Sequence, residues 1–324
     1  MEYRIAIVNS SSFGQYFPEH LERLRAIGSV EPVRVDGDAH GRALAEALGD
    51  YNVVIASVTP FFDAEFFKYK RDLLLLSRHG IGFNNVDIEA ARKAGCQVVT
   101  VPPKVERDAV AEGAVATLMD VMRRVSDARM AANEGRWADR ASFIGSGLSG
   151  KTLGIVGCGN IGTRVVEILS RGFDMRVLAC DPVHHEEWAG VLGVQYADLD
   201  TVVSGCDVLS LNADLNPSSF HIIDEHALSL MKRGVYVVDN ARADLIDQQA
   251  MLKALGDGMV AGLAIDVMHD EPPALDDPYF NHPKVLVTTH ISAYTVECLH
   301  GMGEKCVGDV ERFVRGEEPV NAKN

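Results

Sequence analysis

Short apolar runs rich in β-branched residues alternate with segments of helical periodicity along most of the chain. In the first third these runs are RIAIVNS, VEPVRV, NVVIASV, DLLLLS and CQVVTV. Helical spacing lies between them, near residues 18–27, 42–48 and 88–95. Strands that are separated by helices pair in parallel through right-handed crossovers. The pattern therefore predicts an α/β domain with a parallel sheet.

The segment DAVAEGAVATLMDVMRRVSDARMAANEG, residues 108–135, has a longer helical pattern. Its apolar residues recur three or four positions apart, which predicts one long amphipathic helix. They are Val110, Ala114, Leu118, Val121, Val125 and Ala128. Such a helix suits a bridge between domains or a dimer contact, and an ordinary packed helix is an equally good interpretation.

A second alternating region follows the glycine-rich stretch ASFIGSGLSG. Its apolar runs are KTLGIV, MRVLAC, DVLSL, VYVVDN, MVAGLAI and VLVTT, with a helix predicted from Ile161. These runs predict a second parallel sheet. The final stretch, TVECLHGMGEKCVGDVERFV, again has helical spacing, and we expect it to form a helix that could cross back to the first domain.

Length and charge narrow the possible functions. A chain of 324 residues has material for about two domains. The formal net charge of -15 repels phosphate backbones and anionic lipid surfaces, so we expect neither nucleic acid nor membrane as a partner. The start of the chain, MEYRIAIVNS, does not read as a signal peptide. The 6 cysteines are scattered and indicate buried thiols in a reducing compartment, so we predict a cytoplasmic location.

Gly157, Gly159 and Gly162 form a G-x-G-x-x-G motif between an apolar strand and an amphipathic helix. The first glycine permits a tight turn, the second lets the backbone approach a pyrophosphate, and the third lets helix and strand pack closely. About twenty positions further on, Asp181 ends the next strand, where a carboxylate binds the adenosine ribose hydroxyls. The motif and Asp181 together predict NAD as the cofactor.

Three later strands of the second region each end in polar residues: Arg242, then Asp266 and Glu271, then His290. Residues beyond the carboxyl ends of parallel strands converge on one crevice, where a dinucleotide lies. Taken singly, His290 could be a structural histidine, Arg242 a surface ion-pair partner and Glu271 a loop carboxylate. Jointly, a guanidinium, a carboxylate and an imidazole suit catalysis. No two of the 11 histidines have H-x-x-x-H or HExxH spacing, so we predict no metal site.

The stretches GCGNIG, DNARADLID, GLAIDVMHDEP and HISAYT resemble the D-isomer-specific 2-hydroxyacid dehydrogenase family, and FIGSGLSGKTLG is similar to its D-hydroxyisocaproate and D-lactate branch. The resemblance implies two doubly wound parallel-sheet domains. Residues 1–102 and 291–324 would form a flavodoxin-like catalytic domain. Residues 103–290 would form a Rossmann domain that binds NAD.

The resemblance also implies roles for individual residues. Arg242 would hold the carboxylate and keto oxygen of a small 2-oxoacid, and His290 would be the acid/base, with Glu271 as its partner. In the loop GIGF, backbone N–H groups near Ile81 and Gly82 would bind the substrate carboxylate. Asp266 would hold the nicotinamide carboxamide. The predicted cofactor-binding residues are Gly157, Gly159, Asn160, Ile161, Gly162, Asp181, Asn212, Ala241 and Asp266.

The substrate and the assembly are the open points. Pro103 and Lys104 stand where the D-lactate-like enzymes generally have a tyrosine that lines the substrate pocket. A phosphoglycerate- or glycerate-type dehydrogenase is therefore an alternative within the family, and an NAD-sensing corepressor-like binding protein is an alternative from another class. The family arrangement and the long helix predict a homodimer.

Overall fold

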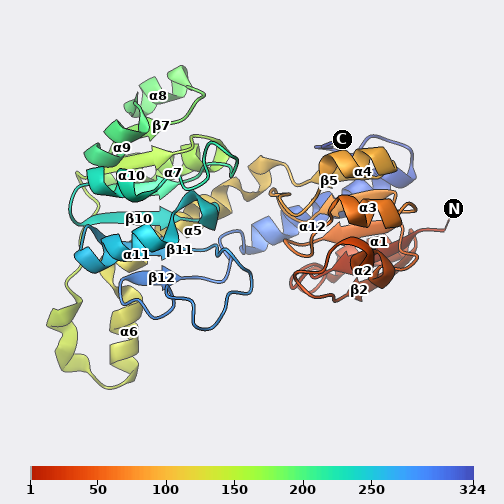
Figure 1. The fold of residues 1–324 in the computed structure, drawn as a ribbon, viewed down its shortest axis with the longest axis horizontal. Helices are drawn as coiled ribbons and strands as arrows, with labels where there is room; N and C mark the ends of the chain where they lie inside the picture. Colours follow the sequence, from red (N-terminus) through yellow and green to blue (C-terminus); the bar gives the residue numbers. More distant parts are fainter. Residues whose placement is uncertain (1) are drawn as a thin grey trace. The chain divides into compact units, whose positions relative to one another are not determined.

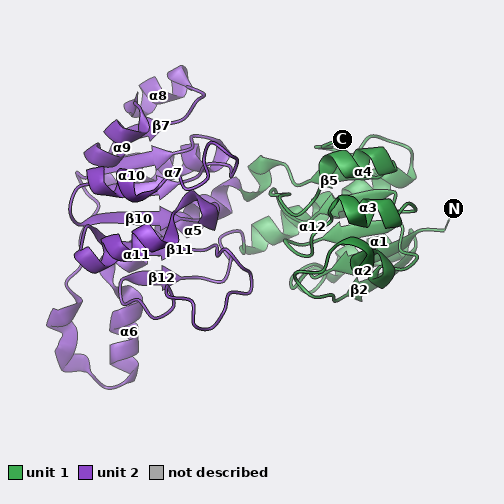
Figure 2. Cartoon of the chain, in the orientation of Figure 1, with its two compact units in different colours: residues 1–106, 294–324 green, residues 107–293 purple. Residues whose placement is uncertain are grey.

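The computed structural model describes residues 2–324. The chain divides into two compact units (Figure 2). Unit 1 comprises the residues up to Glu106 together with Tyr294–Asn324, and unit 2 comprises Arg107–Ala293. Each unit is built on its own parallel sheet, as Figure 1 shows. The predicted fold class of two parallel-sheet α/β domains is confirmed.

Unit 1 has a five-stranded parallel sheet in the order β2-β1-β3-β4-β5. This is the flavodoxin-like strand order, and alternate strand residues pack against helices on opposite faces. Helices α2, α3 and α4 cover one face, while α1 and α12 cover the other. The strands are Arg4–Val8, Ser29–Val33, Val53–Ala56, Leu75–Arg78 and Gln97–Thr100. The helices are α1 Pro18–Arg25, α2 Gly41–Ala47, α3 Ala64–Tyr69, α4 Ile88–Ala94 and α12 Val296–Val314.

Unit 2 has a seven-stranded parallel sheet in the order β12-β11-β10-β9-β6-β7-β8. Read from β8, it follows the Rossmann order with one added edge strand, β12. The three residues of β12 are only half-buried because β12 lies at the edge of the sheet. The strands are β6 Thr152–Val156, β7 Arg176–Cys180, β8 Val194–Tyr196, β9 Val208–Leu211, β10 Val235–Asp239, β11 Val260–Ile265 and β12 Val285–Val287. The helices after β6 are α7 Asn160–Phe173, α8 Glu186–Leu192, α9 Leu199–Gly205, α10 Glu225–Leu230 and α11 Gln248–Asp257.

The prediction of one long helix over residues 108–135 was wrong. The segment forms α5, Pro103–Arg123, and α6, Val125–Asn133, because Arg124 has a left-handed φ of 54°. The carboxylate of Asp120 accepts hydrogen bonds from Ser126 N at 2.8 Å and from Ser126 Oγ at 2.5 Å. These local side-chain bonds compete with the helical backbone ladder and fix the break. After α6, the 3₁₀ helix η1, Trp137–Phe143, completes an arm on unit 2 (Figure 1).

Five of the six cysteines are buried, as predicted from the sequence. All six cysteines are free, and only Cys180 is more than marginally exposed. Burial raises the pKa of Cys96, Cys158, Cys206, Cys298 and Cys306 to about 12, so these thiols stay protonated at neutral pH. Within residues 2–324, none of the helices combines the length and the apolar character that crossing a bilayer requires.

Candidate active site

The glycine motif forms a tight turn between β6 and α7. Gly157 has a φ of +91°, and a Cβ on it would lie 2.6 Å from Ala213 N. A Cβ on Gly162 would lie 2.0 Å from Gly157 O, so helix and turn could not pack as closely with any other residue. By contrast, a Cβ on Gly159 would meet nothing within 4 Å. Gly159 is the N-cap residue of α7, and it has no side chain that could cap the first N–H groups of the helix. The open space at this helix N-terminus fits a pyrophosphate.

Asp181 lies beside this turn, directly after β7. Its carboxylate accepts hydrogen bonds from Cys158 N at 2.5 Å and from Val183 N at 2.7 Å. Both bonds fix the orientation of the carboxylate, and each oxygen keeps a lone pair for a ribose hydroxyl. Asn212 N donates to Val156 O at 2.8 Å. Asn212 therefore follows β9, on the side of β6 away from β7 and Asp181. These residues, with Asn160 and Ile161 at the start of α7, fit the adenosine and pyrophosphate parts of NAD.

The segment after β10 carries Arg242. Asp239, the last residue of β10, accepts hydrogen bonds from Ala241 N at 2.8 Å and from Arg242 N at 3.3 Å. The guanidinium Nη1 of Arg242 donates to Ala241 O at 2.6 Å. Asn240 bonds to Ser292 Oγ at 2.5 Å and links this segment to the one that follows His290. Arg242 is thus held at the sheet end through its own backbone.

Asp266, after β11, organises the segment that carries His290. It is 1% exposed and accepts four hydrogen bonds, from Thr288 Oγ1, Ile291 N, Ser292 N and Ser292 Oγ. These donors lie on both sides of His290, whose φ of 56° is left-handed. Such a conformation costs about 1–3 kcal/mol for a residue with a side chain, and the bonds to Asp266 keep His290 in it.

Glu271 and His290 form a close pair. His290 Nδ1 lies 2.7 Å from Glu271 Oε2, and Met268 N donates to Glu271 Oε1 at 3.1 Å. The side chains of His290 and Glu271 are 39% and 26% exposed, so the pair can be reached from solvent. Since Nδ1 faces the carboxylate, Nε2 is the ring nitrogen left for chemistry. This carboxylate–imidazole arrangement can hold a proton and deliver it to a carbonyl oxygen.

The predicted substrate loop lies in unit 1, directly after β4. Ile81 N donates to the carboxylate of Glu106 at 2.9 Å, so that N–H group already has an acceptor. Gly82 follows it and is half-buried. Gly80 has a φ of +152°, and a Cβ on it would lie 2.5 Å from the Arg78 guanidinium. The loop therefore packs closely against Arg78.

Sequence reasoning missed Asp239, Thr288 and Ser292. Asp239 is the last residue of β10, and it was included in the apolar run VYVVDN without an assigned role in the site. It is fully buried, and burial raises the pKa of its carboxyl to about 7 against the opposing backbone hydrogen bonds and the nearby Arg242. Asp239 Oδ2 has no hydrogen-bond partner.

We expect Asp239→Asn to change how stability depends on pH. The carboxyl titrates near pH 4 when unfolded but near 7 when folded, so the stability that its protonated form contributes is lost as pH rises between these values. Asn cannot ionise, and the variant should gain up to about 4 kcal/mol of unfolding free energy relative to wild type between pH 4 and pH 8. Urea unfolding of both proteins across this range measures the difference. Parallel pH curves would show that Asp239 is ionised in the folded protein.

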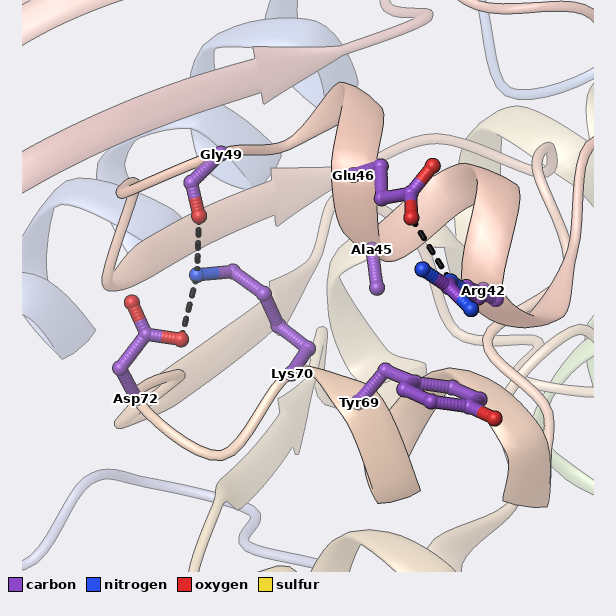
Figure 3. A pocket seen from close by; sticks show the side chains of 7 residues that line it. All are labelled: Arg42, Ala45, Glu46, Gly49, Tyr69, Lys70 and Asp72. Carbon is purple, nitrogen blue, oxygen red and sulfur yellow. Dashed lines mark hydrogen bonds and ion pairs between the residues drawn. The ribbon is translucent and has the colours of Figure 1, made fainter.

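A shallow pocket of about 370 Å³ lies elsewhere in unit 1, between α2 and α3 (Figure 3). Lys70 Nζ donates to Gly49 O at 2.8 Å and to Asp72 at 2.6 Å, and Arg42 pairs with Glu46 at 2.7 Å. The charged side chains of the pocket thus bind one another. None of these charged side chains belongs to the predicted site.

Comparison with known proteins points in one direction. Residues 115–292 match the model of the family described as D-isomer specific 2-hydroxyacid dehydrogenase, NAD binding domain. A glyoxylate reductase of Korarchaeum cryptofilum is 33% identical over 286 residues, which cover 87% of this chain and 86% of that protein. A D-3-phosphoglycerate dehydrogenase of Archaeoglobus fulgidus is 32% identical, covering 87% of this chain but only 53% of that protein.

A solved structure is similar over nearly the whole length. It is D-lactate dehydrogenase from Aquifex aeolicus complexed with NAD and lactic acid, with a TM-score of 0.83 and 25% identity. The alignment covers 97% of this chain and 96% of that one.

Proposed function

Because the chain belongs to the D-isomer specific 2-hydroxyacid dehydrogenase family, with NAD as cofactor, we propose that it interconverts a small 2-oxoacid and the D-2-hydroxyacid. The observation that carries this proposal is the His290–Glu271 pair at 2.7 Å. The pair follows β11 and β12 in the same unit as the glycine turn, and Arg242 follows β10, the strand next to β11. Under this proposal unit 2 binds the cofactor and unit 1 contributes to substrate binding.

The cofactor supplies a hydride acceptor or donor, and the chain orients it. Gly157, Gly159 and Gly162, with the first N–H groups of α7 at Asn160 and Ile161, receive the pyrophosphate. Asp181 accepts hydrogen bonds from the adenosine ribose hydroxyls. Asn212 and Ala241 follow β9 and β10 at the same sheet end and would line the path toward the nicotinamide. Asp266 holds the His290 segment, and its contact with the carboxamide remains a prediction, since four donors already occupy its carboxylate.

Arg242 and His290 act on the substrate. The planar guanidinium makes two parallel charge-assisted hydrogen bonds to the 2-oxoacid and polarises its carbonyl. As hydride reaches the carbonyl carbon, His290 Nε2 gives its proton to the carbonyl oxygen, and Glu271 stabilises the imidazolium beforehand. In the oxidative direction neutral His290 takes the hydroxyl proton. The backbone N–H of Gly82 is proposed to contact the substrate carboxylate, whereas such a contact by Ile81 remains a prediction because its N–H already donates to Glu106 at 2.9 Å.

We expect Asp181→Ala to shift the cofactor preference. The change removes the ribose hydrogen bonds and the repulsion of a 2′-phosphate together, so the Kd of NADH should rise about tenfold or more while NADPH binding improves. Titration of the purified protein with each nucleotide, followed by cofactor fluorescence, measures both constants. Asp200→Ala, an exposed carboxylate in the same unit, serves as the control. An unchanged ratio of the two constants would reject the assignment of Asp181.

The substrate is proposed at the level of its class. Similar proteins are named for glyoxylate, a small 2-oxoacid, and for 3-phosphoglycerate, a phosphorylated acid. The test therefore includes both kinds of acid. NADH oxidation with pyruvate, 2-oxoisocaproate, phenylpyruvate, glyoxylate, hydroxypyruvate and 3-phosphohydroxypyruvate tests the proposal. Turnover of at least one acid is the expected result. Tight NADH binding without turnover of any of them would favour an NAD-sensing binding protein.

We also propose a homodimer and a cytoplasmic location. The arm of α6 and η1 exposes large apolar side chains that a second copy would cover, with Trp137 75% and Ile144 82% exposed. The free cysteines support a reducing compartment. Analytical ultracentrifugation at micromolar concentration should give a dimer, and Trp137→Glu should shift it toward monomer. A monomeric wild-type protein would contradict the proposed homodimer.

A further inference from the structure

Two helices of unit 1 bring together histidine and carboxylate side chains that the proposed reaction does not use. α1 supplies Glu19 and His20, α12 supplies His300, and the two helices pack against each other. One carboxylate oxygen of Glu19 and one ring nitrogen of each histidine lie within 4.8 Å of one another. Across residues 2–324, this is the one group of three such side chains close enough to share a metal ion.

His20 is fixed before any ligand arrives. It is 1% exposed, and its Nε2 lies 3.1 Å from Glu304 Oε1. Arg23 donates to the same carboxylate oxygen at 2.6 Å. A Cβ on Gly303 would lie 2.3 Å from the His20 ring, so the ring rests directly on the backbone of α12. Little side-chain entropy remains for His20 to lose on binding.

Phe17 orients both imidazoles. Its ring centroid lies 5.5 Å from that of His20 and 4.9 Å from that of His300, the second contact being edge-on. The two imidazole centroids are 5.5 Å apart. Glu19 and His300 are exposed, so an ion can enter from solvent.

We propose that Glu19, His20 and His300 bind a divalent transition-metal ion and thereby clamp α1 to α12. Two imidazoles and one carboxylate match Zn²⁺ best, with a water molecule in the fourth position. Glu304 fixes the orientation of the His20 ring from outside the group, because its Oε1 lies 3.1 Å from His20 Nε2.

Calorimetric titration of the chelator-treated full-length protein with Zn²⁺ alone tests the proposal. One Zn²⁺ per chain should bind, and the thermal unfolding midpoint should rise by a few degrees. His300→Ala should weaken binding by about tenfold or more, and Glu19→Gln should weaken it less. His300 and Glu19 are exposed, so both variants should fold as wild type does.

His40→Ala is the matched control. His40 is an exposed histidine of the same unit that pairs with a single carboxylate, Asp63, and its loss should leave Zn²⁺ affinity unchanged. No saturable binding at millimolar Zn²⁺ would overturn the proposal. So would a His300→Ala variant that binds as tightly as wild type, since the ion would then lie elsewhere. The readout is binding, so neither result bears on the proposed dehydrogenase activity.

Discussion

His290→Ala should lower kcat for 2-oxoacid reduction by about 10²- to 10⁴-fold, the usual contribution of a positioned acid/base. The side chain is partly exposed and Asp266 holds its segment through Thr288, Ile291 and Ser292, so the variant should fold normally. NADH affinity should change little, because the glycine turn and Asp181 are untouched. Steady-state kinetics and NADH titration separate these effects.

His226→Ala is the control for His290→Ala. His226 also lies in unit 2 and also faces a carboxylate, Asp200 at 3.5 Å, but both side chains are well exposed. It should retain wild-type kcat. A His290→Ala variant with near wild-type turnover would return His290 to a structural role.

Glu271→Gln tests the coupling behind this prediction. The carboxylate faces Nδ1 of His290 at 2.7 Å and thereby leaves Nε2 for the substrate. Glu271→Gln keeps a side chain of similar size but removes the carboxylate, so kcat should fall by about tenfold or more in both directions while NADH affinity stays unchanged. Wild-type kcat in both directions would show that the pair is not functional.

Arg242→Lys should have the second-largest effect. An ammonium keeps the charge but cannot reproduce the two parallel hydrogen bonds of a guanidinium. We expect kcat/KM to fall by about 10²-fold or more, with the loss divided between a higher KM and a lower kcat. Arg242 also donates to Ala241 O at 2.6 Å, so a thermal unfolding curve is needed to show that the segment stays intact.

Arg233→Lys provides the control for Arg242→Lys, since Arg233 also donates to a backbone carbonyl, Asp257 O at 2.6 Å, but is exposed. Its kinetics should match those of wild type. If Arg242→Lys weakens NADH binding as much as substrate binding, Arg242 belongs to the cofactor site instead.

The sheets could be predicted because apolar strand runs and intervening helices are strong local signals. Both sheets form from the runs that the sequence shows, except for β8, Val194–Tyr196, whose three residues are too few to stand out as an apolar run. Helix α3 was not predicted, because its six residues are too few for a periodic pattern and its core residues Phe66 and Phe67 are adjacent. The break at Arg124 depends on a hydrogen bond between Asp120 and Ser126, which periodicity cannot reveal.

The site residues that follow apolar strands could be predicted from the sequence. The residues whose role depends on contacts between distant parts of the chain could not. Arg242, Glu271 and His290 each follow an apolar run, so topology alone brings them to one sheet end. The four donors around Asp266 and the burial of Asp239 appear only in three dimensions. The group of Glu19, His20 and His300 has no local spacing at all, since α1 and α12 lie near opposite ends of the chain.

The configuration and yield of the product test the central claim most directly. The purified protein is incubated with NADH and the best 2-oxoacid of the panel, and the 2-hydroxyacid formed is resolved on a chiral column. We predict one D-2-hydroxyacid for each NADH oxidised. The L isomer, or no hydroxyacid despite bound NADH, would contradict the assignment.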